Sequence, residues 1–326
     1  MALLEVQDLS VVFVRRGERP FTAVEEVSFS VEPGQTVGLV GESGCGKSVT
    51  SLAIMGLLPA RGNRVSGRVL FDGTDLLKLS PAALRDRRGR DIGMIFQDPL
   101  SSLNPVVPLG VQVAEVLQRH RGRDRTEAMR EAGQLLDAVG IPDPSRRLKE
   151  YPHQISGGMR QRTLIAIALA CQPRLLIADE PTTALDVTIQ AQILTLLREL
   201  VSGTGTALVM ITHDLGVVAG LCDQVNVLYA GKVVERAARH DLFGSARHPY
   251  THGLLASVPR LDSPRRERLV PLRGSVSDNI PWTEGCAFAP RCDRVIESCV
   301  DGTPPLVPAE DRALRCLNPV PGKVAS

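Results

Sequence analysis

Apolar and polar residues alternate in two runs near the start of the chain, at residues 3–12 and 27–31. This alternation is typical of half-buried antiparallel strands, because successive side chains point to opposite faces of a sheet. Residues 36–41, TVGLVG, instead form an almost continuous apolar run that leads through glycines into a helix-compatible segment at 47–57. Such a run indicates a strand buried on both faces. The pattern therefore predicts a strand, a loop and a helix in succession.

Later apolar runs have the same buried character and are interleaved with helical stretches such as residues 187–201. They lie at residues 91–96, 175–180, 207–212 and 225–229. Strands that alternate with helices predict an α/β fold with a parallel-sheet core, preceded here by an antiparallel β subdomain.

Between residues 109 and 170 the pattern becomes helical. Amphipathic segments lie at 111–117, 126–139 and 159–170. They predict a helical subdomain over about 100–170. After Phe243 prolines recur and long apolar runs vanish, which places a domain boundary near residue 245. The expected domains are 1–245 and a small cysteine-rich C-terminal domain, 246–326.

Composition narrows the possible partners. A chain of 326 residues, 43% of them hydrophobic, can bury a substantial core. Its 38 basic and 36 acidic residues leave a formal net charge of +2, so no overall field indicates a nucleic-acid partner. The basic runs at 84–90 and 119–125 are interpreted as solvated surface, with contact to lipid headgroups or to a partner subunit as the alternative.

The chain is expected to stay inside the cell. Its N-terminus lacks a basic start followed by a long apolar stretch, and Glu5 already introduces a charge. No apolar run approaches the roughly 20 residues that cross a bilayer. Any membrane role should be peripheral.

The seven cysteines are unevenly distributed. Cys45, Cys171 and Cys222 are scattered, whereas the other four lie together in the tail: Cys286, Cys292, Cys299 and Cys316. Stable disulfides are rare in the reducing cytosol, so the cluster suggests a metal centre. Four thiolates suit an iron–sulfur cluster or tetrahedral Zn²⁺, and a proline-rich tail with little core would gain stability from either. Structural zinc sites favour closer cysteine spacing, which favours iron and sulfide; four unrelated buried cysteines are the alternative.

The segment GESGCGKS, residues 41–48, follows the buried strand and precedes the helix. It matches the phosphate-binding loop (P-loop), whose glycines let successive N–H groups face phosphate oxygens at the positive end of a helix. Lys47 would reach the β- and γ-phosphates, and the Ser48 hydroxyl would coordinate Mg²⁺. The candidate nucleotide-binding residues here are Gly41, Glu42, Ser43, Gly44, Cys45, Gly46, Lys47, Ser48 and Val49.

A second motif with catalytic side chains, LLIADEP, occupies residues 175–181. Asp179 ends the apolar strand and is expected to hold Mg²⁺ through water, while Glu180 is expected to orient and deprotonate the attacking water. An acidic pair after a strand can also serve helix capping, but its place after a P-loop favours the catalytic interpretation.

The segment ISGGMRQR, residues 155–162, precedes this strand. With it, residues 1–240 resemble the nucleotide-binding subunits of ATP-binding cassette (ABC) transporters. The resemblance implies that Ser156, Gly157 and Gly158 face the γ-phosphate of an ATP held by the opposite subunit, so that two chains enclose each nucleotide. Met159 stands where many members of the family have Gln; ATP binding should survive, because the expected contacts are made by the backbone.

Other positions of the family pattern follow in order. The resemblance implies that Gln97 senses Mg²⁺ and the attacking water, and that Asp186, in Ala184–Asp186, lies at the dimer interface. It implies that His213 holds Glu180 and the water in line. Phe13 stands where the family places an aromatic residue that stacks on adenine, with Phe21 as the rival.

The tail narrows the resemblance further. The segment RHPYTHGLLASVP, residues 247–259, and the four tail cysteines resemble the oligopeptide, dipeptide and nickel import ATPases. In the peptide-transport members such thiols ligate a [4Fe-4S] cluster. The resemblance thus implies ATP, Mg²⁺ and an iron–sulfur cluster as bound groups, with Zn²⁺ as the alternative to the cluster.

The main hypothesis is an ATPase subunit that drives import of di- and oligopeptides from the cytoplasmic face of the membrane. The implied partners are a second, related but non-identical cassette, two membrane permease subunits and, indirectly, an extracytoplasmic solute-binding protein. Alternatives are the same role for nickel or another solute, and a soluble cassette ATPase that acts on ribosomes or DNA. A non-catalytic binding module is opposed by Glu180 and His213.

Overall fold

The computed structural model describes residues 2–14, 17, 19–183, 185–257, 272–276, 285–309 and 312–322. The chain divides into two compact units. The first comprises residues 1–3, 31–35 and 78–210, and the second comprises residues 4–30, 36–77 and 211–326.

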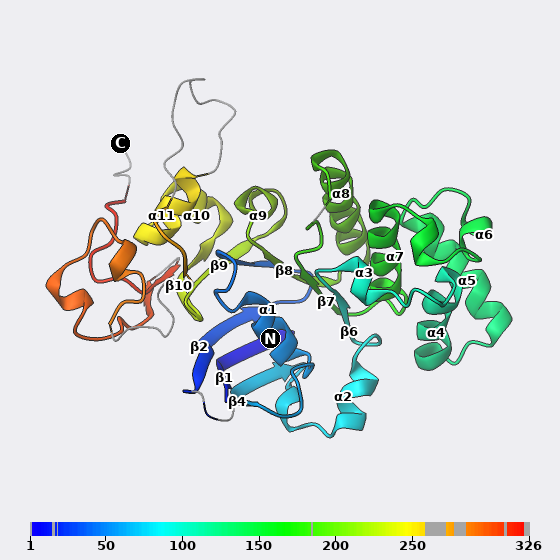
Figure 1. Cartoon of the computed structure of the whole chain (residues 1–326), viewed down its shortest axis with the longest axis horizontal. Helices are drawn as coiled ribbons and strands as arrows, with labels where there is room; N and C mark the ends of the chain where they lie inside the picture. The colour runs from blue at the N-terminus through cyan, green and yellow to red at the C-terminus, as the bar shows by residue number, and fades with distance from the viewer. Residues whose placement is uncertain are drawn as a thin grey trace. The chain divides into compact units, whose positions relative to one another are not determined.

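The second unit begins with an antiparallel sheet of order β2-β1-β4-β5, in which β1, β2 and β4 lie side by side (Figure 1). Its strands are β1 (Leu4–Phe13), β2 (Phe21–Val31), β4 (Asn63–Phe71) and β5 (Thr74–Asp75). The prediction of strands at residues 3–12 and 27–31 agrees with β1 and β2, although β2 begins earlier, at Phe21. The strand β4 lacks a clear pattern because Gly67 interrupts it and most of its N-terminal part is exposed.

The same unit holds five strands in the order β11-β12-β10-β9-β3. They are β3 (Thr36–Val40), β9 (Gln224–Tyr229), β10 (Lys232–Ala238), β11 (Val307–Ala309) and β12 (Arg312–Leu314). The apolar strands β3 and β9 pair in parallel, from Val37 with Gln224 to Val40 with Val227. Their residues Val37–Val40 and Val225–Tyr229 are buried, as continuous apolar runs require.

In the described part of this unit, the helices are α1 (Lys47–Ile54), α9 (Leu215–Leu221), α10 (Arg239–Gly244) and α11 (Pro249–Ala256). Short 3₁₀ turns lie at Ala289–Arg291 and Glu297–Cys299, and another at Leu76–Lys78 ends on the first residue of the next segment of the first unit. The side chain of Val218 on α9 lies 3.0 Å from the position that a Cβ on Gly38 would take, so the glycine allows the helix to pack closely on β3.

The first unit contains neighbouring strands β6 (Ile92–Ile95) and β7 (Leu175–Asp179), followed in order by β8 (Ala207–Thr212), whose last two residues belong to the second unit. The pair β6–β7 is parallel, from Ile92 with Leu175 to Ile95 with Ala178. Parallel pairing aligns the carboxyl ends of the two strands, which is the edge where ligands of open α/β sheets bind.

Helices make up the rest of the first unit. They are α2 (Pro81–Arg87), α3 (Pro99–Ser102), α4 (Leu109–Arg121), α5 (Arg125–Ala138), α6 (Pro144–Arg147), α7 (Gly157–Leu169) and α8 (Val187–Thr204), with a 3₁₀ turn at Pro152–Gln154. Figure 1 shows α4, α5 and α7 grouped together. The prediction of three helical segments between residues 109 and 170 agrees with α4, α5 and α7.

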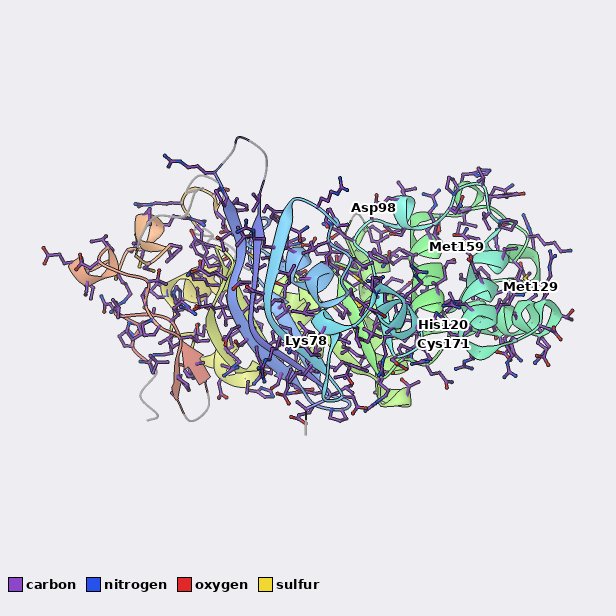
Figure 2. All side chains as sticks on the ribbon, turned by 90° about the horizontal axis from the view of Figure 1, so that it is seen from below. Lys78, Asp98, His120, Met129, Met159 and Cys171 are labelled. Carbon is purple, nitrogen blue, oxygen red and sulfur yellow. The ribbon has the colours of Figure 1, made fainter. Side chains whose placement is uncertain are left out.

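Apolar contacts hold this helical region together. Leu103, Leu109, Ile155 and Leu164 form a buried cluster, against which the partly buried Met159 and Ile167 pack. Figure 2 shows Met159 near the start of α7 and Met129 on α5. The side chain of Met159 therefore contributes to the packing of this cluster. No helix in the described part of the chain is long and apolar enough to cross a membrane.

Candidate functional site

The P-loop joins β3 to α1, and its glycines permit its path. Gly46 caps α1 with φ +100°, in the left-handed region, and a Cβ there would lie 2.5 Å from the carbonyl oxygen of Ala23. A Cβ on Gly41 would collide with the carbonyl oxygen of Leu228. Any larger residue at these two positions would force the backbone away from the loop geometry.

Lys47 closes the loop upon itself. Its Nζ donates hydrogen bonds to the carbonyl oxygens of Gly41, at 2.7 Å, and Glu42, at 3.0 Å, and the residue is buried. Ser43 and Gly44 are exposed at the tip, while Ser48 and Val49 are half-buried in the first turn of α1. The loop is therefore folded around its own lysine, with its tip open to solvent.

Cys45 lies inside this loop and is fully buried. Burial is the main cause that raises the pKa of its thiol, opposed by the nearby Lys47 ammonium. The side chain is thus a neutral packing group in this conformation.

In the first unit, the parallel pairing of β6 and β7 brings Gln97 and Glu180 together. Gln97 Nε2 donates to Glu180 Oε2 at 3.2 Å, and the Thr183 hydroxyl donates to the same oxygen at 2.9 Å. Asp179, the last residue of β7, is buried beside them. A carboxylate held by two donors at a strand end is well placed to orient a polar reactant.

Glu180 has an uncommon backbone conformation. Its φ is +46°, and the residue is 8% exposed. A non-glycine residue in the left-handed region costs on the order of 1 kcal/mol, and such residues cluster at functional sites. The turn directs the Glu180 carboxylate toward Gln97 immediately after the buried strand.

The segment Ser156–Gly158 forms the start of α7. The Ser156 hydroxyl accepts a hydrogen bond from the Met159 N–H at 3.4 Å, and Ser156 and Gly157 are exposed. Gly158 lies against α8, because a Cβ there would come within 2.9 Å of Ile189. Asp186 caps α8 by accepting from the Ile189 N–H at 3.0 Å. The N-termini of α7 and α8 are therefore neighbours; Ala184 lies outside the described residues.

The remaining candidates belong to the second unit. His213 is exposed directly after β8, and Phe13 is half-buried at the end of β1, opposite Asn63. The structure thus groups Gln97, Asp179 and Glu180 in the first unit, with the α7 and α8 N-termini also there. The P-loop, Phe13, His213 and the tail cysteines lie in the second.

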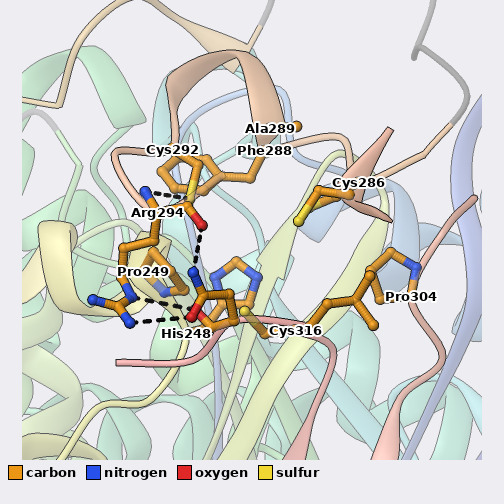
Figure 3. A pocket seen from close by; sticks show the side chains of 12 residues that line it. His248, Pro249, Cys286, Phe288, Ala289, Cys292, Arg294, Pro304 and Cys316 are labelled. Carbon is orange, nitrogen blue, oxygen red and sulfur yellow. Dashed lines mark hydrogen bonds between the residues drawn. The ribbon is translucent and has the colours of Figure 1, made fainter. Parts of the chain in front are cut away.

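The four tail cysteines line one cavity, together with His248 and Phe288 (Figure 3). We call this cavity the thiol pocket. Burial raises the pKa of Cys286 and Cys292, and it raises the pKa of Cys316 to about 11. A bound cation would reverse this effect and release the thiol protons.

In the described part of the chain, one buried ring nitrogen of His248 in this pocket lacks a hydrogen-bond partner. The residue is 1% exposed, and its Nδ1 accepts a hydrogen bond from the Tyr250 N–H at 3.1 Å. The ring proton therefore lies on Nε2, which has no hydrogen-bond partner among the residues that the structure describes. Burial lowers the pKa of His248 to about 3, with a small opposing effect from the Arg315 main chain.

Within the part of the chain that the structure describes, the side chains of the thiol pocket give no support for a metal centre. Within the described residues, no three His, Cys, Asp or Glu side chains form a group that could hold one metal ion. Four thiolates around one Zn²⁺ would lie about 3.8 Å apart, given Zn–S bonds of about 2.3 Å.

Sequence reasoning gave no role to His248, Tyr250, Glu235 or Arg291. Glu235 is fully buried on β10 and accepts hydrogen bonds from the Arg247 and His248 N–H groups, both at 2.9 Å. A single acidic residue in the apolar run VVERAA was the available signal. It anchors the segment that carries His248.

The structure places a glycine-rich phosphate-binding loop between a buried strand and a helix, and an Asp-Glu pair at the end of another buried strand. These two features define the class of P-loop nucleotide-binding proteins. Residues 24–183 match the ABC transporter family, and residues 234–299 match the oligopeptide/dipeptide transporter C-terminal region. The chain belongs to the ABC transporter family, in the group of oligopeptide and dipeptide transport ATP-binding proteins.

The similarity extends over nearly the whole chain. The oligopeptide transport ATP-binding protein OppD of Salmonella typhimurium is 50% identical over 319 residues, covering 98% of this chain and 94% of that protein. The dipeptide transport ATP-binding protein DppD of Bacillus subtilis is 53% identical over 298 residues, covering 91% and 88%.

Solved structures agree with the cassette fold. The dimeric ATP-binding cassette MJ0796, in a post-hydrolysis state bound to ADP and phosphate, is 28% identical with a TM-score of 0.64, covering 72% of this chain and 98% of that one. The protein cbiO1 of Clostridium perfringens, part of the cbiONQ ABC transporter complex, is 27% identical with a TM-score of 0.61, covering 74% and 90%.

Proposed function

We propose that this protein is the ATP-hydrolysing subunit of a membrane complex that imports di- and oligopeptides. The observation that carries the proposal is the near-full-length identity of about 50% to oligopeptide transport ATP-binding proteins, tail included. The geometry of Glu180 supports the hydrolytic part, because Gln97 and Thr183 hold its carboxylate at the end of β7.

The candidate residues take the following roles in this proposal. The P-loop N–H groups and Lys47 bind the triphosphate, while Ser48, Gln97 and Asp179 hold Mg²⁺, which supplies charge neutralisation on the phosphates when bound. Glu180 accepts a proton from the attacking water, and Gln97 and His213 orient that water. Phe13 stacks on adenine.

The exposed start of α7 supports a dimer of cassettes. Ser156 and Gly157 present a helix N-terminus to solvent, which is a surface that favours the phosphate of a nucleotide on a second subunit. Asp186 would lie at the same interface. We infer a related, non-identical partner cassette, two permease subunits at the cytoplasmic face of the membrane, and an extracytoplasmic binding protein that delivers peptide.

We also propose that the thiol pocket binds a [4Fe-4S] cluster through Cys286, Cys292, Cys299 and Cys316, in a tail domain of residues 246–326. Four thiols on one cavity and the unpartnered Nε2 of His248 support this assignment. When bound, the cluster would brace a segment with little regular structure. Zn²⁺ is the alternative occupant.

Reconstitution of the whole complex in liposomes tests the transport function. We expect ATP-dependent uptake of a labelled tripeptide, and we expect Glu180→Gln to retain ATP binding but to lower hydrolysis and uptake at least about a hundredfold. Glu199→Gln, on the outer part of α8, is the matched control and should behave as wild type. Peptide uptake that is unaffected by Glu180→Gln, or uptake of nickel without peptide, would contradict the proposal.

A further inference from the structure

Arg291 lies in the tail at the end of a 3₁₀ turn between Cys286 and Cys292, yet its side chain contacts the P-loop. The side chain is only 4% exposed. Its two terminal nitrogens donate to the two carboxylate oxygens of Glu42, at 2.6 and 2.9 Å. This is the bidentate geometry in which guanidinium and carboxylate bind most strongly and with the most defined orientation.

The other donors of Arg291 are also engaged. Nε donates to the carbonyl oxygen of Arg273 at 2.6 Å, Nη2 to that of Gly274 at 3.1 Å, and Nη1 to the Tyr229 hydroxyl at 3.3 Å. All five N–H groups of the guanidinium thus have an acceptor. Such a fully bonded group has little freedom to change position.

Glu42, the second residue of the P-loop, is held at three points. Its carboxylate binds Arg291, its N–H donates to the Tyr250 hydroxyl at 2.9 Å, and its carbonyl accepts from Lys47 Nζ at 3.0 Å. Two of these three contacts come from residues far along the chain. The conformation of the loop at Glu42 therefore depends on groups outside the motif.

Aromatic rings shield this contact. The guanidinium carbon of Arg291 lies 5.7 Å from the ring centroid of Tyr229 and 5.8 Å from that of Phe288. Tyr250 packs edge-on against Tyr229, with centroids 4.6 Å apart. Exclusion of water strengthens the ion pair, and cation–π contacts add to its rigidity.

A P-loop binds phosphate through N–H groups that must converge on one point. Ordering a flexible loop on binding has an entropic cost that weakens the affinity for the ligand. A loop that is already ordered before binding therefore binds phosphate more tightly. A buried ion pair can also be a simple element of stability, and the experiment must separate these two roles.

We propose that Arg291 is a positioning residue for the P-loop. Arg291 holds Glu42, so that the loop is already formed when the triphosphate binds. The affinity for nucleotide therefore depends on the cysteine-bearing segment that carries Arg291. The inference rests on the proposed function as an ATPase. It assigns to the tail a direct effect on the nucleotide site.

The test compares full-length variants by equilibrium binding of ATP and by steady-state hydrolysis. Arg291→Met should weaken ATP binding about tenfold and raise KM for ATP, with kcat at saturating ATP retained. Arg291→Lys should recover only part of the affinity, because an ammonium cannot reproduce the bidentate fork. Glu42→Gln should weaken binding similarly, and the double variant should show no further loss.

Arg294→Met is the matched control. Arg294 lies three residues further along the same segment, and its side chain binds Asn318 within the tail rather than the P-loop. Its ATP affinity should equal that of wild type. Should Arg291→Met fail to fold, Arg291→Lys and Glu42→Gln provide the same measurement.

The outcomes separate the two proposals. Wild-type protein that does not bind ATP would overturn the proposed function. Wild-type protein that binds ATP with the same affinity as the Arg291 and Glu42 variants would overturn only the role of Arg291. An equal loss in Arg294→Met would also overturn it, since the effect would then be a general loosening of the tail.

Discussion

The P-loop and the thiol pocket lie in the same unit but are built in different ways. The P-loop is one continuous stretch between β3 and α1, closed by hydrogen bonds from Lys47 to Gly41 and Glu42. The thiol pocket collects residues from 248 to 318 around short 3₁₀ turns and three-residue strands. Neighbouring residues determine most of the geometry of a contiguous motif. The geometry of a dispersed site depends on how the whole segment folds.

The two sites also differ in how their polar groups are satisfied. Lys47 already has carbonyl partners, so the P-loop needs no ligand to keep its form. In the thiol pocket, Nε2 of His248 has no hydrogen-bond partner within the described segments, and buried polar groups without partners cost on the order of 1 kcal/mol or more. The P-loop therefore keeps its form without a ligand, whereas the proposed occupant of the thiol pocket would stabilise that pocket.

The largest effect is expected at the P-loop. Lys47→Met should lower ATP hydrolysis at least about a hundredfold, because the charge that binds the β- and γ-phosphates is lost. Phosphate release by the purified complex measures it. Lys232→Met, which removes a lysine paired with Glu25 at 2.5 Å, is the control and should retain activity. A dispensable Lys47 would remove the P-loop from the mechanism.

A change in the thiol pocket should act on its occupant and on stability more than on the chemistry. Cys316→Ser should abolish visible absorbance and acid-labile sulfide in anaerobically purified protein and lower Tm by about 5 °C. Cys171→Ser, outside the pocket, is the control and should retain both. A colourless wild-type protein with stoichiometric zinc would identify Zn²⁺ as the occupant and reject the cluster.

The smallest effect concerns pH. His248 is neutral when folded because burial lowers its pKa to about 3, while an unfolded histidine takes up a proton near pH 6.5. Its contribution is intact above about pH 6.5 and is lost progressively as the pH falls toward 3. At pH 5 the loss should be about 2 kcal/mol of unfolding free energy, measured by urea denaturation.

A matched pair of variants isolates this contribution. His248→Gln should flatten the stability profile between pH 7 and 5, because the glutamine does not titrate. Cys316→Ser should keep the wild-type slope even though its pocket is altered. An identical slope in wild type and His248→Gln would show that another group governs acid stability.

Much of the cassette could be predicted from the sequence because its signals are local. The apolar run at 36–41 and the following glycines indicate β3, the P-loop and α1, and the runs at 91–96 and 175–180 become neighbouring parallel strands. From that pairing the meeting of Gln97 and Glu180 follows, since parallel strands align their carboxyl ends.

Other features could not be predicted because they depend on distant contacts. The buried Glu235 makes β10 look like a surface segment, although its carboxylate is satisfied by N–H groups of the following turn. Arg291 and Glu42 are 249 residues apart, and no local pattern pairs them before the fold brings them together.

Alkylation of Cys45 offers a chemical measure of how often the P-loop opens. The sulfur is fully enclosed beneath Lys47 and protonated, so an electrophile reaches it only during moments when the loop is open. The rate of its alkylation therefore reports the frequency of these openings. A cysteine that takes no part in catalysis becomes a native sensor of whether the nucleotide cradle is closed.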